Sequence, residues 1–113
     1  MENKAAELAQ KQLDAYNAQN LEAFLSVYSE NVEIRDFPSN DLVYKGIDKM
    51  RERYGKLFKE NPQQHAHLLG RIEQDNFVID HEKVTRRSNG KEVFAIAMYE
   101  TDGSRITKVW FKK

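Results

Sequence analysis

Apolar residues recur every three or four positions along the first part of the chain, which is the spacing of amphipathic helices. Residues 4–18 carry one such stripe, and a shorter stripe follows Asn20, whose side chain suits a helix N-cap. We expect the second helix to end near Ser29. A third stripe begins at Ile47 and stops before Pro62, because proline cannot continue a helix. Three helices are therefore predicted.

Elsewhere the apolar residues alternate with polar ones, which indicates strands. A strand at 32–36 and a short one at 42–45 are expected between the second and third helices. Beyond Pro62, four strands are expected at residues 64–74, 77–87, 91–101 and 104–112. Their boundaries are the turn-forming pairs Asp75-Asn76, Asn89-Gly90 and Asp102-Gly103. Strands joined in this way form an antiparallel meander.

Helices that precede a run of strands pack on one side of the resulting sheet, so the predicted fold class is α+β rather than alternating α/β. A length of 113 residues favours a single domain, residues 1–113. Both faces of the strand at 91–101 carry apolar side chains: Phe94, Ile96 and Met98 on one, Val93, Ala95, Ala97 and Tyr99 on the other. Helices cover only one face of a sheet, so we expect a homodimer through the outer face.

Composition narrows the range of partners. The 18 basic and 18 acidic residues cancel, so nothing favours nucleic acid or an anionic membrane. Cysteine is absent, which excludes disulfides and cysteine nucleophiles and makes a cytoplasmic location the expectation. No apolar run approaches the ~20 residues that span a bilayer. Residues 1–12 lack the apolar core of a signal peptide, so none is expected.

Three strings in this order of elements resemble the nuclear transport factor 2-like superfamily, which includes steroid delta-isomerases and SnoaL-like polyketide cyclases. The strings are AYNAQNLEAFLSVYSENVEIRD (15–36), YKGIDKMRERY (44–54) and YETDGSRITKVWF (99–111). The resemblance implies a cone-shaped roll, with three N-terminal helices packed on a strongly curved, mainly antiparallel sheet. It also implies an internal pocket, for which we expect a small hydrophobic molecule, and an enzyme that only moves a proton there would need no cofactor.

The resemblance makes Asp36, at the end of the first strand, the candidate catalytic base. The isomerases also use two oxyanion donors; Gln12 stands in place of their tyrosine, and residues 94–97 contain no acid. Because losing one such donor costs roughly 3–4 kcal/mol, authentic steroid isomerisation is not expected. Asp36 has an alternative role in capping the turn that follows it. Burial beside an apolar cavity would favour the base, and exposure within its own turn would oppose it.

Other polar residues offer weaker candidates. Asp80 and Glu82 share one strand face and His81 takes the other; we favour a solvated or dimer-facing strip, with the pocket wall as the alternative. His65 and His67 also share a face, but without a third ligand they predict no metal site. His67 is a candidate proton shuttle with Asp36. The basic pairs Arg86-Arg87 and Lys112-Lys113 are interpreted as solvated strand ends.

Aromatic residues at helix and strand spacing pack mainly in the core, and in a cone the core and the pocket wall are continuous. Tyr54 matches a supporting tyrosine of the isomerases. The residues predicted to line the pocket are Gln12, Tyr16, Tyr28, Tyr54, Phe58, His67, Tyr99 and Trp110. Two functions follow: proton transfer on a hydrophobic carbonyl compound, as an isomerase, cyclase or lyase performs it, or non-catalytic ligand binding or protein interaction by the same fold.

Overall fold

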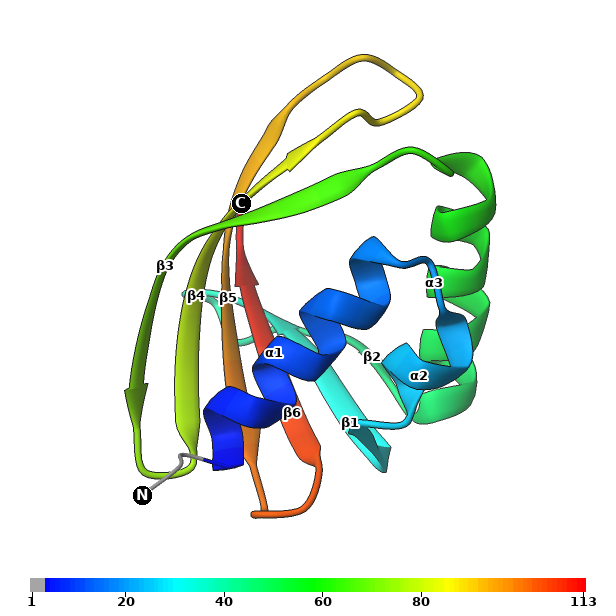
Figure 1. Ribbon diagram of the computed structural model, residues 1–113. Coiled ribbons are helices and arrows are strands. Elements are labelled where there is room, and N and C mark those ends of the chain that lie inside the picture. Colours follow the sequence, from blue (N-terminus) through cyan, green and yellow to red (C-terminus); the bar gives the residue numbers. More distant parts are fainter. Residues whose placement is uncertain (1–3) are drawn as a thin grey trace.

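Residues 4–113, which the computed structural model describes, form three helices and six strands (Figure 1). Residues 1–3 of the expected domain lie outside the described part. The helices are α1 (Lys4–Asn17), α2 (Leu21–Leu25) and α3 (Ile47–Glu60). The strands are β1 (Tyr28–Asp36), β2 (Leu42–Lys45), β3 (His65–Gln74), β4 (Phe77–Thr85), β5 (Val93–Thr101) and β6 (Ile106–Lys112).

All six strands belong to one sheet in the order β2-β1-β6-β5-β4-β3. β1 runs parallel to β6, and every other neighbouring pair is antiparallel. The predicted meander from β3 to β6 is therefore confirmed, as is the α+β class. Its turns contain the residues expected there: Asp75, Gly90 and Gly103 adopt φ of 55°, 75° and 92°. Glycine adopts such angles without steric cost, and aspartate tolerates them.

The second helix is shorter than its apolar spacing predicts. It ends at Leu25 rather than near Ser29, and β1 already begins at Tyr28. The N–H of Ile106 donates to the carbonyl of Val27 at 2.8 Å, and Tyr28 pairs with Ile106 across the parallel ladder. Pairing with a strand distant in sequence thus overrides the local helical preference. Asn20 is the N-cap as predicted, its Oδ1 accepting from Ala23 N–H at 3.1 Å.

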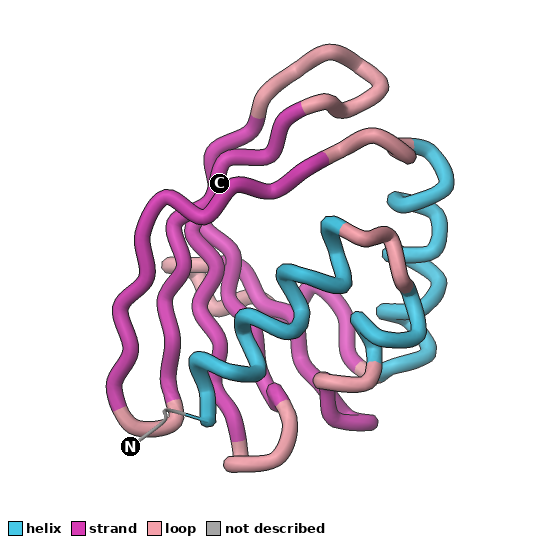
Figure 2. The backbone as a smooth tube through the Cα atoms, viewed as in Figure 1, coloured by secondary structure: helices cyan, strands magenta, loops and turns pink. Residues whose placement is uncertain are grey.

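The sheet is strongly curved and remains open, and α1 lies along its concave side while α3 stands at its far end (Figures 1 and 2). Where α1, α2, β1 and α3 meet, five rings form a cluster with neighbouring centroids 4.5–6.4 Å apart. Such offset and edge-on contacts stabilise a core beyond the area they bury. The members of this cluster are Tyr16, Phe24, Tyr28, Tyr54 and Phe58.

The two faces of the sheet differ as the alternation predicts. On β5, Ala97 and Tyr99 are buried beneath the helices, whereas Phe94 and Ile96 on the convex face are exposed. No helix among residues 4–113 combines the length and apolarity needed to cross a bilayer.

Candidate active site

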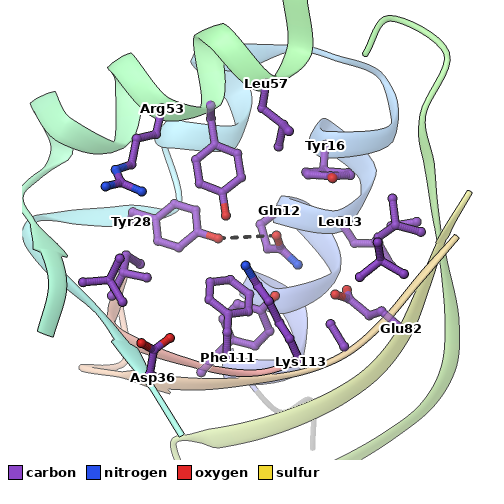
Figure 3. Close-up of a pocket in the computed structure, with 18 of the residues that line it drawn as sticks. Gln12, Leu13, Tyr16, Tyr28, Asp36, Arg53, Leu57, Glu82, Phe111 and Lys113 are labelled. Atoms are coloured by element: carbon purple, nitrogen blue, oxygen red, sulfur yellow. Dashed lines mark hydrogen bonds between the residues drawn. The ribbon is translucent and has the colours of Figure 1, made fainter. Parts of the chain in front are cut away.

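A cavity of about 470 Å³ opens between the concave face of the sheet and helices α1 and α3 (Figure 3). Its wall mixes apolar side chains with tyrosine hydroxyls, an amide and charged groups. This size lies within the ~300–1,000 Å³ typical of small-molecule sites. Six of the residues that the sequence predicts as catalytic or pocket-lining are found in its wall: Gln12, Tyr16, Tyr28, Asp36, Tyr54 and Tyr99.

Three residues predicted to line the cavity lie elsewhere. Phe58 is buried in the aromatic cluster. His67 is exposed, with its Nε2 3.0 Å from the hydroxyl of Thr85. Trp110 lies on the outer face, where its Nε1 donates to Asn40 Oδ1 at 2.9 Å. The alternation along each strand explains His67 and Trp110, because their immediate neighbours take the inward positions.

Asp36 stands at the rim of the cavity and is exposed. Its backbone N–H donates to the carbonyl of Asp41 at 2.9 Å, and its carbonyl accepts from the N–H of Asn40 at 2.8 Å. The residue is thus fixed within its own turn, the arrangement that opposes a role as base.

Asp80 and Glu82 face the interior, so the favoured interpretation of a solvated or dimer-facing strip is wrong. Asp80 is 0% and Glu82 8% exposed, while His81 between them is exposed. The sequence did not decide this, because both faces of the strand carry apolar residues. The inward set also contains Val78 and Val84, and the outward set Phe77 and Ile79.

Asp80 is held in a buried ion pair with Arg71 of β3. The guanidinium donates from Nε to Oδ1 at 2.7 Å and from Nη2 to Oδ2 at 2.9 Å, which is a bidentate geometry. Its remaining Nη1 donates to Oε1 of Gln10 on α1 at 2.9 Å. The contacts of Arg71 therefore join α1, β3 and β4, and they neutralise the buried carboxylate of Asp80.

Glu82 is the other buried acid, and among residues 4–113 its carboxylate has no hydrogen-bond or ion-pair partner. It points from β4 into the cavity (Figure 3). Burial, followed by the neighbouring charge of Asp80, raises the pKa of Glu82 to about 7, and Arg71 acts in the opposite direction. Near neutral pH the residue therefore exists in both protonation forms, as an acid–base catalyst requires.

Gln12 presents a hydrogen-bond donor to the same cavity. The hydroxyl of Tyr28 donates to its Oε1 at 3.3 Å (Figure 3), which turns the amide nitrogen away from Tyr28. That nitrogen, Nε2, is buried and has no partner within the described chain. A buried donor without a partner costs about 1–3 kcal/mol, and a ligand acceptor would remove that cost. Gln12 thus brings to the cavity wall a donor that the described chain does not satisfy.

The hydroxyls of the cavity tyrosines are donors over the whole physiological pH range. Burial raises the pKa of Tyr28, Tyr54 and Tyr99 well above the ordinary value, with smaller contributions from neighbouring side chains. These groups stay protonated and add no negative charge to the cavity; the hydroxyl of Tyr28 already donates to Gln12.

Three cationic residues also line the cavity: Arg53, Arg87 and Lys113. The interpretation of Arg87 as a solvated strand end is wrong, because its Nε is buried. Lys113 is exposed, yet its side chain extends into the cavity (Figure 3). Within the described chain, no group of three or more acidic or histidine side chains is arranged to hold a metal ion.

A family model described as the SnoaL-like domain matches residues 9–109, and the chain belongs to this family. An uncharacterised cystatin-fold protein from Novosphingobium aromaticivorans is 24% identical, with a TM-score of 0.87 and complete coverage of both chains. An NTF2-like protein of unknown function from Cytophaga hutchinsonii is 18% identical, with a TM-score of 0.79 over 99% of this chain and 91% of that one.

A proposed polyketide cyclase from Sinorhizobium meliloti is 14% identical, with a TM-score of 0.78 over 94% of each chain. No curated protein matches the sequence. These likenesses show the fold, and the expected membership of the nuclear transport factor 2-like superfamily is confirmed.

Proposed function

We propose that this protein is a cofactor-free enzyme that moves a proton at a carbon next to the carbonyl group of a hydrophobic compound, with Glu82 as the general base. One observation carries the proposal: a buried carboxylate and a buried amide donor, neither with a hydrogen-bond partner among residues 4–113, belong to side chains that line the same cavity. The role first assigned to Asp36 passes to Glu82, since Glu82 meets the burial criterion that Asp36 does not.

The two groups divide the reaction between them. The ionised Glu82 takes the proton, and the C–H electron pair forms a carbon–carbon double bond while the carbonyl π pair moves to oxygen. The resulting enolate oxygen accepts a hydrogen bond from Nε2 of Gln12, which stabilises the developing charge. Protonated Glu82 then returns the proton to the same or another carbon, and its carboxylate is regenerated.

The alternative is a non-catalytic binding module of the same fold. Gln12 supports this alternative, because a neutral amide is a weaker oxyanion donor than a charged or acidic group. The likeness to a proposed polyketide cyclase supports the enzyme.

Deuterium wash-in tests the proposal. A panel of cyclic ketones and enones is incubated in heavy water with the wild type, Glu82→Gln and Asp36→Asn, and carbon-bound deuterium is measured by mass spectrometry. We expect exchange with the wild type and Asp36→Asn, and its loss in Glu82→Gln, which keeps shape but cannot accept the proton. Loss in Asp36→Asn alone would return the role to Asp36. No exchange with the wild type across the panel would favour the binding module.

We also propose that the protein forms a homodimer and lies in the cytoplasm. A row of apolar side chains, paired across neighbouring strands of the convex face, supports the dimer. At one end of this row Ile72 is 67% exposed. The row runs through Ile72, Ile79, Met98 and Trp110. The cysteine-free composition supports a reducing compartment.

A further inference from the structure

Arg87 points into the cavity because the backbone before it departs from strand geometry. Val84 lines the cavity, so alternation alone would turn residue 86 inward and residue 87 outward. Arg86 instead adopts φ of 58°, a left-handed conformation that is unfavourable for a residue with a side chain by roughly 1–2 kcal/mol. Arg86 is exposed and Arg87 is turned inward. Backbone strain of this kind clusters at functional sites.

The loop that carries Arg87 is attached to the end of α3. The N–H of Ser88 donates to Oδ1 of Asn61 at 3.0 Å, and the hydroxyl of Ser88 donates to the carbonyl of Glu60. Both contacts lie immediately beside Arg87, so they fix its backbone. The inward direction of the guanidinium is thus built into the fold.

No acidic partner within residues 4–113 neutralises this guanidinium. It contacts the hydroxyl of Tyr16, which in turn donates to Oε1 of Gln64 at 2.9 Å. The buried Nε of Arg87 has no hydrogen-bond partner in the described chain. Glu82 lies in the same cavity, but its carboxylate forms no ion pair with Arg87. The described chain therefore leaves a buried N–H of the permanently charged Arg87 without an acceptor.

The charges around the cavity favour an anionic ligand. Three cations, Arg53, Arg87 and Lys113, line it with two acids, Asp36 and Glu82, and Asp36 is exposed to solvent. Arg53 lies over an aromatic ring, that of Tyr44, at 4.6 Å from the centroid rather than against an acid. A guanidinium offers a planar pair of N–H groups, which matches the two oxygens of a carboxylate.

We propose that the cavity takes a hydrophobic carboxylate whose anionic group is received by Arg87. Only the placing of a ligand carbonyl at Gln12 rests on the proposed function; the contact with Arg87 does not. The ligand class is a ring compound that bears a carboxylate, in which the ring occupies the apolar wall and the acid reaches the end of α3. An acid of this class that also has a ketone would meet both donors.

Isothermal titration calorimetry with matched probes tests this assignment. Benzoate, cyclohexanecarboxylate and 2-naphthoate are compared with their neutral amides, which have the same shape without the charge. We expect at least one carboxylate to bind the wild type about tenfold or more tighter than its amide. Arg87→Gln should abolish this preference. The matched control is Arg86→Gln, which removes the same charge from the neighbouring outward side chain and should preserve the preference.

Arg87→Lys provides a second variant if Arg87→Gln does not fold, and it should retain only part of the preference because an ammonium lacks the planar fork. Equal binding of acids and amides, no binding of any probe, or a preference that survives Arg87→Gln would overturn the assignment. The readout is separate from catalysis. A preserved preference without deuterium exchange would refute only the enzyme, whereas exchange without the preference would refute only the carboxylate ligand.

Discussion

Asp80 and Glu82 point to the same side of β4, two positions apart, and both are buried. Asp80 has a bidentate partner in Arg71 and belongs to the scaffold. Glu82 has no partner among the described residues and faces a cavity. Burial is nearly equal for the two acids, so burial alone does not mark a functional residue. The difference lies in whether the protein itself satisfies the charge.

The same distinction applies to the cations of the interior. The guanidinium of Arg71 donates to Asp80 and Gln10, whereas the buried Nε of Arg87 has no acceptor within the described part of the chain. In both pairs, the fold satisfies the charge of one member and leaves the other without such a partner among the described residues. Substitutions of Arg71 and Glu82 therefore test the distinction.

The largest effect is expected from Arg71→Ala, which leaves Asp80 charged, buried and unpaired. Breaking such a pair costs about 3–5 kcal/mol of the free energy of unfolding. Urea denaturation followed by circular dichroism measures it. The matched control is Arg105→Ala on an exposed loop, with an expected change within about 0.5 kcal/mol. A loss below about 1 kcal/mol for Arg71→Ala would show that the pair is not part of the scaffold.

Glu82→Gln should raise the stability relative to wild type, whereas Arg71→Ala lowers it, and the gain should depend on pH. The pKa of Glu82 is raised from 4.5 to about 7, so between these pH values the folded protein keeps a proton that the unfolded chain releases. Wild-type stability therefore falls as pH rises through this window and levels off above it. The variant lacks this loss, so its stability relative to wild type should improve by about 3 kcal/mol between pH 4.5 and pH 8.

Unfolding by urea at a series of pH values provides the measurement, and the exposed Glu52→Gln serves as the control. A difference between Glu82→Gln and wild type that does not change with pH would contradict a titrating carboxyl in the cavity.

Much of the fold was predictable because it depends on local periodicity. The helices and the hairpin turns follow from spacing that short segments of sequence already contain. The exception, the early end of α2, arises from pairing between Tyr28 and Ile106, which are far apart in sequence. Local patterns do not contain such information.

The site was only partly predictable. Gln12 came from the family resemblance, but Glu82 could not be placed because β4 has apolar residues on both faces. Arg87 gave no sequence signal, since its direction depends on a left-handed conformation at Arg86, a residue type that does not favour it. Asp36 matched by position, yet its exposure depends on how its own turn folds.

A smaller effect is expected from Tyr28→Phe, which removes the hydroxyl that orients the amide of Gln12. The cost in stability should be about 1 kcal/mol, the net value of one hydrogen bond. The rate of deuterium exchange should fall by more than the loss of stability accounts for, because the amide of Gln12 is then free to rotate. Normal exchange in this variant would show that Gln12 needs no orientation. Tyr44→Phe, which removes another cavity hydroxyl not bonded to Gln12, is the control.

The smallest effect on the stability of one chain is expected from Ile96→Lys on the convex face. His81 points to the convex face and pairs there with Ile96, which is 37% exposed. If this face joins two copies, Ile96→Lys places a charge in the contact and should yield a monomer by light scattering, where the wild type is a dimer. Because position 96 faces away from the cavity, exchange at Glu82 should not change. A monomeric wild type, or a dimer that survives the substitution, would remove the convex face from the assembly.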